Sequence, residues 1–140
     1  MGIFHYESFE FEALRYEIIV LMRNFKELLI WQKGMEIWKK CYFLGKQLPS
    51  EERYGLLSQI SRASSSIPAN IAEGSARKGN KDQSRFIQIA LGSSFELETF
   101  LIGIGEMKLA DSDSVKEILA LVDEEQKMLI SFQSKLKARG

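Results

Sequence analysis

Hydrophobic residues from Phe25 onward recur at intervals of three and four, the spacing that places side chains on one face of an α-helix. Alternation typical of β-strands does not run far, and only two prolines, Pro49 and Pro68, interrupt the chain. The first helical run is expected to end near Pro49. Its apolar positions are Phe25, Leu28, Trp31 (or Leu29), Met35, Trp38, Tyr42 and Gly45.

The second run has the most regular spacing in the chain. Ser50, followed by Glu51 and Glu52, is expected to cap its start. Its members are small or medium in size, so a neighbouring backbone can approach closely. Pro68 falls inside the run, and we expect a kink there rather than the end of the helix. The apolar positions are Leu56, Ile60, Ala63, Ile67, Asn70 and Gly74.

Two further helical runs follow. Residues 74–79 are expected to form a loop, after which Asn80 and Gln83 resemble a capping box that starts the third helix. Residues 110–114 predict a second turn, with Ser114 and Glu117 as another possible capping box. The apolar positions are Phe86, Ala90, Ser93, Leu97, Phe100 (or Leu101) and Ile104 in the third helix, and Val115, Ile118, Val122, Leu129, Phe132 and Leu136 in the fourth.

Four amphipathic helices joined by short loops predict an all-α, antiparallel, up-and-down four-helix bundle for residues 22–140. Residues 1–21 stand outside this scheme as an N-terminal extension. We expect some helix there, because Phe9, Ala13, Tyr16 and Val20 are roughly in phase.

Composition and charge exclude several classes of protein. Hydrophobic residues make up 45% of the 140 residues and charged residues 27%, which is typical of a soluble globular domain. The 19 basic and 19 acidic residues cancel, which argues against binding nucleic acid by bulk charge alone. Residues 53–85 nevertheless have a net charge of +4, the one electrostatic sign of an anionic partner. Their basic residues are Arg53, Arg62, Arg77, Lys78, Lys81 and Arg85, against Glu73 and Asp82.

Candidate chemistry is sparse. The chain has one cysteine, Cys41, and one histidine, His5, so acid–base catalysis by histidine and most zinc sites are not expected. Gly74 and Gly79 are spaced as in a phosphate-binding loop, but Asn80 stands where that loop needs lysine. We therefore expect no enzymatic activity, no metal and no cofactor. No membrane span or signal peptide is expected either, and the predicted location is the cytoplasm.

Five stretches together carry a family resemblance. They are Phe25-Lys-Glu-Leu-Leu-Ile-Trp31-Gln-Lys, Glu51-Glu-Arg-Tyr54-Gly55-Leu56, Gln59-Ile-Ser-Arg62-Ala63, Ser66-Ile67-Pro68-Ala-Asn70-Ile71-Ala72-Glu73-Gly74 and Ile89-Ala90-Leu-Gly92-Ser93. From about Met22 to the C-terminus, the chain resembles the bacterial four-helix-bundle family encoded in intervening sequences of 23S ribosomal RNA genes.

The resemblance implies a homo-oligomeric ring, specifically a homopentamer. A related branch, the accessory proteins of diversity-generating retroelements, associates with a reverse transcriptase and nucleic acid. Family members usually begin just before the Phe25 stretch, so Met22 is a plausible natural start. Residues 1–21 are then either an upstream extension of the reading frame or a genuine appendage.

Two functions remain open at this point. The first is a nucleic-acid-associated or ribonucleoprotein scaffold that binds RNA or DNA. Its candidate contacts are Arg53, Arg62, Arg77, Lys78, Lys81 and Arg85. The second is a protein–protein adaptor that presents a ring surface to a partner such as a reverse transcriptase.

The shared motif residues are interpreted as structural or as assembly contacts. Gln59 and Arg62 are expected to join Glu73 in a buried network, and Gly55, Ala63 and Gly74 to be close-packing points. Trp31, Trp38, Tyr42 and Phe43 are expected in the core or at a subunit contact. The complete set of motif positions is Tyr54, Gly55, Gln59, Ala63, Pro68, Asn70, Glu73 and Gly74.

Overall fold

The computed structural model describes residues 10–15 and 24–139, and every regular element in these ranges is helical. Residues 10–15 form a short helix, hereafter the arm helix. The remaining elements are η1 (Asn24–Glu27), α2 (Leu29–Gly45), η2 (Ser50–Glu52), α3 (Leu56–Ser75), α4 (Asn80–Glu106) and α5 (Ser112–Arg139).

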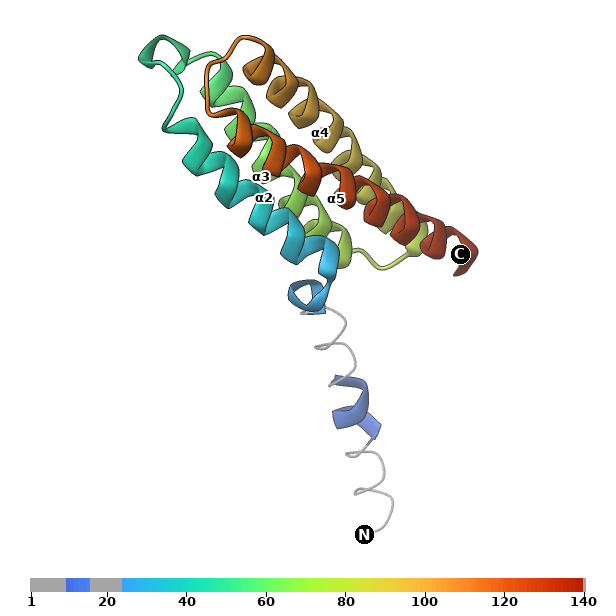
Figure 1. Cartoon of the computed structure of the whole chain (residues 1–140). Coiled ribbons are helices and arrows are strands. Elements are labelled where there is room, and N and C mark those ends of the chain that lie inside the picture. Colours follow the sequence, from blue (N-terminus) through green and yellow to red (C-terminus); the bar gives the residue numbers. More distant parts are fainter. Residues whose placement is uncertain (1–9, 16–23, 140) are drawn as a thin grey trace.

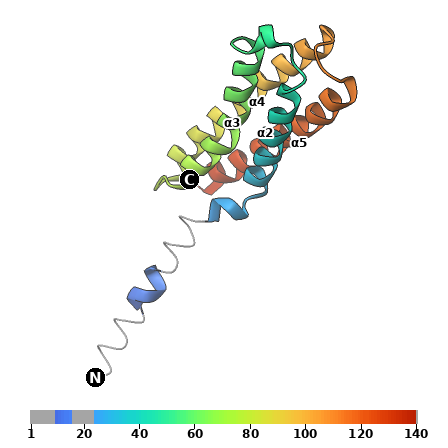
Figure 2. The same ribbon diagram turned by 90° about the vertical axis from the view of Figure 1, so that its left-hand side faces the viewer.

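The four long helices form a bundle in which successive helices run in opposite directions (Figure 1). Helix α3 contacts α2 and α4, and α5 contacts α4 and α2. Helices α2 and α4 therefore lie diagonally across the bundle. The α3–α4 connection, the start of α2 and the end of α5 share one end of the bundle, and η2 lies at the other (Figures 1 and 2). The prediction of an all-helical bundle is confirmed for the described residues.

The core is built mainly from branched aliphatic side chains contributed by all four helices. On α3 and α4 the predicted positions Ile60, Ala63, Ile67, Ala90 and Leu97 are fully buried, and other residues that were not predicted, such as Ile71 and Ile87, are buried with them. The tight packing of such side chains is the main stabilising contribution to a bundle of this kind.

Helix α2 carries two apolar stripes, and part of the predicted one faces outward. The buried stripe is Ile30, Gly34, Ile37, Cys41 and Leu44. The predicted stripe, one position away, leaves large parts of its aromatic side chains in solvent. The assignment of Trp38 and Tyr42 to the core is therefore wrong, because the smaller residues fit between α3 and α5. Gly45 is buried, and Leu28 and Trp31 pack partly buried against the core, so the error concerns only part of the predicted stripe. Its exposed members are Trp38 at 39% and Tyr42 at 58%, with neighbouring Phe43 at 62%.

Pro68 lies inside α3, and the helix continues through it as predicted. A proline cannot donate the backbone hydrogen bond to the carbonyl four residues earlier, here that of Ser64. The nearby serine hydroxyls turn back onto their own helix. Ser64 Oγ donates to the carbonyl of Ile60 at 2.5 Å, and Ser65 Oγ to that of Arg62 at 3.2 Å.

Three predicted helix caps are wrong. Ser50 begins the 3-10 helix η2, and the start of α3 is instead bonded by Glu52, whose Oε2 accepts from the Leu56 N–H at 3.2 Å. Asn80 is the first helical residue of α4, and the preceding Gly79 offers no side chain. At α5, the Asp111 carboxylate is the acceptor for both the N–H and the hydroxyl of Ser114, at 2.9 Å each.

Helices α3 and α4 approach most closely where Gly74 meets Phe86. A Cβ atom placed on Gly74 would lie 2.9 Å from the Phe86 Cβ and 3.4 Å from the Gln83 carbonyl oxygen. Such a separation is shorter than van der Waals contact, so only glycine permits it. This close approach sets the geometry of the α3–α4 connection.

Glu125 on α5 is a fully buried carboxyl group, and its two oxygens have no hydrogen-bond partner among residues 10–15 and 24–139. Its Oε2 lies 3.1 Å from the point where a Cβ on Gly34 would stand. Lys33 is near, but its ammonium donates to Glu124 at 2.8 Å. Burial raises the pKa of Glu125 to about 8, with a smaller opposing effect of Lys33. The group is therefore predominantly neutral at pH 7.

Helix α4 is also long and apolar enough, by length and composition, to cross a membrane. Its buried residues pack against α3 and α5. The core of the bundle thus accounts for its apolar character.

Gly74→Ala is expected to lower the free energy of unfolding by about 1–2 kcal/mol, because overpacking at Phe86 outweighs the better helix propensity of alanine. Urea denaturation monitored by circular dichroism measures this change. Gly92→Ala is the matched control, because nothing lies within 4 Å of the added Cβ. That variant should gain up to about 1 kcal/mol. Equal effects at both sites would contradict the close approach.

Glu125 should make the fold less stable as the pH rises. The pKa is higher in the folded state than in the unfolded chain, so folding favours the protonated form. Its stabilising effect is complete below about pH 4.5 and is lost as the pH rises toward about 8, by at most about 1.4 kcal/mol per unit.

Urea unfolding between about pH 5 and about pH 9 tests this slope. The Glu125→Gln variant, which cannot ionise, should lack the part of the slope that Glu125 contributes. A wild-type slope identical to that of the variant would contradict the buried, neutral carboxyl.

Candidate nucleic-acid interface

A phenylalanine ring organises two of the predicted basic residues at the α3–α4 connection. The guanidinium of Arg77 lies 4.6 Å from the centroid of Phe86, and that of Arg85 lies 5.9 Å from it. Cation–π contacts of this kind hold a guanidinium near a ring. Phe86 is itself fixed against Gly74, so both arginines depend on the close approach of α3 to α4.

Neighbouring carboxylates partly neutralise these arginines. Arg77 lies 3.4 Å from Glu73 and 3.9 Å from Asp82, and Arg85 lies 3.3 Å from Asp82. All four side chains are substantially exposed, so each pair contributes little to stability. The ion pairs of Arg77 and Arg85 order the α3–α4 connection, and they leave these two guanidinium groups less available to a phosphate than an unpaired lysine.

Lys78 and Lys81 lie in the same region with their charges uncompensated. Both are exposed, and among residues 10–15 and 24–139 neither has a carboxylate within ion-pair distance. Lysine ammonium groups of this kind bind phosphate as point charges. Of the four predicted cations at and after the α3–α4 connection, they are the two without a carboxylate partner among the described residues.

The end of α5 adds basic residues that were not among the six predicted contacts. Lys81 and Lys137 line one hollow of about 270 Å³ with Asn80, Ser84 and Leu136. Figures 1 and 2 both place the C-terminal end of α5 beside the α3–α4 connection. Helices α4 and α5 are antiparallel neighbours, so the end of α5 lies beside the start of α4. An up-and-down bundle topology was therefore the signal that could have brought Lys137 into the predicted site. We call the resulting surface the basic end; it comprises Arg77, Lys78, Lys81, Arg85, Lys135, Lys137 and Arg139.

The first turn of α4 adds backbone donors to the basic end. Gly79 precedes the helix in an extended conformation, and no side chain caps it. The first N–H groups of a helix have no partner within the helix, and they give its N-terminus a partial positive charge. Gln83 is the first residue of α4 whose backbone N–H donates a hydrogen bond within the helix, to the Gly79 carbonyl oxygen at 3.0 Å. The free donors therefore point in the direction expected for an anion contact.

Arg53 and Arg62 do not join the basic end. Arg53 follows η2 at the opposite end of the bundle, where its guanidinium lies 5.7 Å from the ring of Tyr54. Arg62 lies midway along α3 and forms an ion pair with Glu96 of α4. The six predicted contacts thus separate into three places, because a continuous helix 20 residues long spreads them along the bundle.

The predicted buried network of Gln59, Arg62 and Glu73 does not form. Gln59 accepts from Arg62 at 2.8 Å, but both side chains are exposed. Glu73 instead pairs with Arg77, one helical turn further on. The register of α3 explains this difference, since Glu73 lies three turns away from Arg62.

The other motif residues divide into turn and packing positions. Tyr54 is 88% exposed, and Gly55 lies in the exposed turn before α3 rather than at a helix contact, which corrects the expectation for Gly55. Ala63 and Pro68 are buried. Asn70 donates to the carbonyl and hydroxyl of Ser66, at 2.8 and 2.9 Å.

Ser66 and Ser93 connect this motif to α4. Their hydroxyl oxygens are 2.8 Å apart, so Asn70, Ser66 and Ser93 form a polar link between α3 and α4. A buried or half-buried polar link of this kind helps to fix helix register.

Two faces of the bundle expose large apolar side chains. On α2, an apolar hollow of about 440 Å³ is lined by Met35, Trp38, Lys39, Tyr42 and Phe43. The Lys46 ammonium lies 5.0 Å from the ring of Tyr42. On α4, the diagonally opposite helix, the exposed residues are Ile89, Phe95 and Ile102.

The reactive groups of the described residues are few. No cluster of three or more histidine, cysteine, aspartate or glutamate side chains with metal-binding geometry occurs in residues 10–15 or 24–139. Burial raises the pKa of the Cys41 thiol to about 12, although a hydrogen bond with Ser64 opposes the shift. Such a thiol is a poor nucleophile.

Comparisons with known proteins identify relatives of this chain. Residues 26–131 match the family model of the 23S rRNA-intervening sequence protein. A crystal structure of a protein of unknown function from the S23 ribosomal protein family of Bacteroides thetaiotaomicron VPI-5482 is similar to this chain, with a TM-score of 0.70 and 26% identity. The match covers 75% of this chain and 98% of that one. No curated protein sequence matches significantly.

Proposed function

The chain belongs to the 23S rRNA-intervening sequence protein family, and we propose that it is a homopentameric, non-enzymatic scaffold that binds RNA or DNA through its basic end. The observation that carries the proposal is that Lys81 and Lys137 line one hollow at the uncapped start of α4, with Lys78 two residues before that helix. The α3–α4 connection and the end of α5, which are distant in sequence, both contribute to that surface.

The two apolar faces support assembly into a ring. A cyclic ring of identical subunits needs two different surfaces on each subunit, one for each neighbour. The face of α2 around Trp38 and Tyr42 and the face of α4 around Phe95 lie on diagonal helices and so look in different directions. We propose that each α2 face packs against the α4 face of the next subunit.

A ring would multiply a modest charge. Cyclic symmetry orients every subunit in the same sense, so copies of the basic end repeat around one rim. Residues 73–85 and 133–139 hold seven basic residues against Glu73 and Asp82. Repeating the positive charge of the basic end around one rim offsets the zero net charge of the whole chain. Binding of RNA or DNA through this rim should weaken steeply as the salt concentration rises.

The proposed absence of catalysis rests on the available side chains. The chain has one histidine, His5, and one cysteine, Cys41, whose thiol is buried. Acid–base and nucleophilic mechanisms commonly need such groups in a cleft. We propose that the protein acts in the cytoplasm, where an unpaired cysteine stays reduced.

An adaptor function is the second candidate, and the far end of the bundle favours it. Tyr54 is 88% exposed, with the Arg53 guanidinium over its ring. Tyrosine and arginine are enriched among the residues that dominate protein–protein contacts. In this proposal, the end opposite the basic end binds a partner protein such as a reverse transcriptase.

Reversing the three free lysines tests the nucleic-acid proposal. The variant with Lys78→Glu, Lys81→Glu and Lys137→Glu should lose most RNA affinity, and its log–log salt slope should fall by roughly 0.7–0.9 for each phosphate contact removed. Fluorescence anisotropy of a labelled structured RNA, at several salt concentrations, measures both quantities.

Arg53→Glu is the control for this experiment, because Arg53 is exposed at the far end. It removes the same kind of charge without touching the basic end. Unchanged affinity and slope in the triple variant would overturn the assignment of the basic end, and a loss in the control alone would move the contact to the far end.

Replacing exposed aromatics on α2 tests the ring. Tyr42→Ser with Phe43→Ser should reduce the pentamer to monomers, while the bundle stays folded because both side chains are more than half exposed. Light scattering measures the mass and circular dichroism the helix content. Ile130→Ser, which removes an apolar side chain that is also more than half exposed from α5, should leave the assembly intact. A double variant with wild-type mass would contradict the proposed α2 interface.

A further inference from the structure

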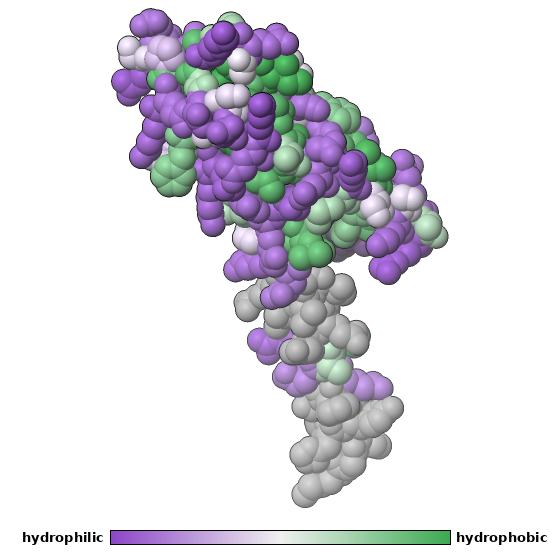
Figure 3. Space-filling view, in the orientation of Figure 1, coloured by the Kyte–Doolittle hydropathy of each residue, from purple (hydrophilic) through white to green (hydrophobic). Residues whose placement is uncertain are grey.

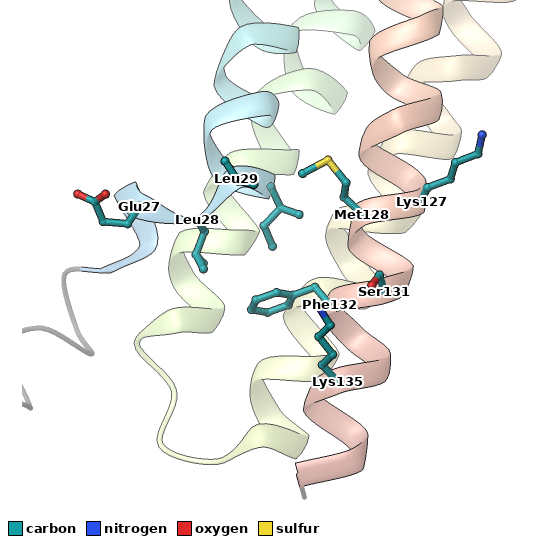
Figure 4. Close-up of a pocket in the computed structure, with 9 residues that line it drawn as sticks. Glu27, Leu28, Leu29, Lys127, Met128, Ser131, Phe132 and Lys135 are labelled. Carbon is teal, nitrogen blue, oxygen red and sulfur yellow. The ribbon is translucent and has the colours of Figure 1, made fainter.

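An open apolar groove lies between the start of α2 and the second half of α5. It has a volume of about 500 Å³. In Figure 4, Leu28 lies on the α2 side of the groove, across from Met128 and Phe132 of α5. These side chains are only partly buried and rest against the core. Figure 3 shows hydrophobic surface near the start of α2, with hydrophilic side chains around it.

Basic side chains border the α5 side of this groove. Lys127 and Lys135 both line it, and Glu27 lies on the opposite side. Lys127 is 3.0 Å from Asp123 in an exposed pair, which is easily exchanged for another carboxylate. Lys135 has no carboxylate within ion-pair distance among the described residues. The groove therefore suits a short amphipathic segment that carries negative charge.

The arm helix has this character. Phe11 and Leu14 are three residues apart, so they share one side, and they are 66% and 57% exposed. Glu10 and Glu12 supply negative charge, of which Arg15 neutralises part at 4.0 Å from Glu12. The first 22 residues have a net charge of −3. A helix of six residues is not stable alone in water, so it needs an apolar partner.

We propose that the arm helix of one copy of this chain docks in the groove of a second copy, with Phe11 and Leu14 against Phe132 and Met128. Figures 1 and 2 both show the arm helix standing away from its own bundle, which favours a groove on another molecule. Its glutamates would face Lys127 and Lys135. The docking rests on the homo-oligomer proposed above but not on the number of its subunits.

Tethering makes a small contact of this kind sufficient. The arm is joined to η1 by residues 16–23, which span at most about 27 Å when fully extended. Within an assembled oligomer, such a short link holds the arm at an effective concentration of about millimolar near a neighbouring groove. A contact too weak to join free molecules can then be occupied most of the time.

Disulfide trapping between differently tagged copies tests the proposal. One copy carries Arg15→Cys, which lies four residues after Phe11 and so on the docking side of the arm helix, and the other carries Ser131→Cys in the groove. The native Cys41 is buried, with its pKa raised, and does not compete. Mild oxidation of the reassembled mixture should give a disulfide between the two tags. Ala120→Cys, on the exposed surface of α5 outside the groove, is the matched control and should give severalfold less.

Charge exchange gives an independent readout of the same contact. Lys127→Glu with Lys135→Glu should lower the disulfide yield severalfold, and Glu10→Lys with Glu12→Lys in the arm copy should restore it. A restored disulfide yield would show that the lysine substitutions had not damaged the fold, because the lysine substitutions are still present in the restored pair. A yield indifferent to both changes would contradict the charged contact.

Light scattering separates this inference from the proposed oligomer. An oligomer that gives no disulfide between tags would overturn the docking while leaving the ring. A monomer that gives none would overturn both. A disulfide that forms only within one chain, in a variant with both cysteines diluted into excess wild-type protein, would overturn docking on a second copy.

Discussion

The contact between Gly74 and Phe86 is the constraint on which the rest of the proposed interface depends. The absence of a side chain on Gly74 lets α3 and α4 meet at a distance that any Cβ would block. Phe86 is thereby fixed beneath the guanidinium groups of Arg77 and Arg85. The same contact sets where α4 begins, and so where its free N–H groups and Lys81 lie relative to the end of α5.

The division of α2 into two apolar stripes connects the fold to assembly. The stripe of smaller residues fills the space between α3 and α5, which leaves Trp38 and Tyr42 of the aromatic stripe partly exposed in the described bundle. Exposed aromatic clusters on a soluble protein commonly mark interaction surfaces. Together with the exposed apolar residues of α4, the diagonally opposite helix, this stripe is the physical basis for the ring that we propose.

The sequence predicted the order of the four long helices of the bundle because the spacing of Ile60, Ala63, Ile67, Ala90 and Leu97 is regular. It did not decide between the stripes of α2, since both satisfy a helical period and only packing volume separates them. Glu125 was missed although the fourth helix has a gap between Val122 and Leu129. A charged residue in such a gap is normally assigned to solvent.

The candidate site was predicted in part for a similar reason. Local charge identified Lys78 and Lys81, but Arg53 and Arg62 were grouped with them by sequence proximity alone. Helix length separates these residues in space, and antiparallel topology adds Lys137 from the other end of the chain. Distances of this kind follow from the fold rather than from composition.

The most direct test of the central claim is the mass of the full chain in solution, measured by light scattering with and without a structured RNA at low and moderate salt. The account predicts a mass of five chains that increases with RNA at low salt and returns to the protein value at moderate salt. A monomer under all conditions, or an oligomer whose mass never changes with RNA, would contradict it.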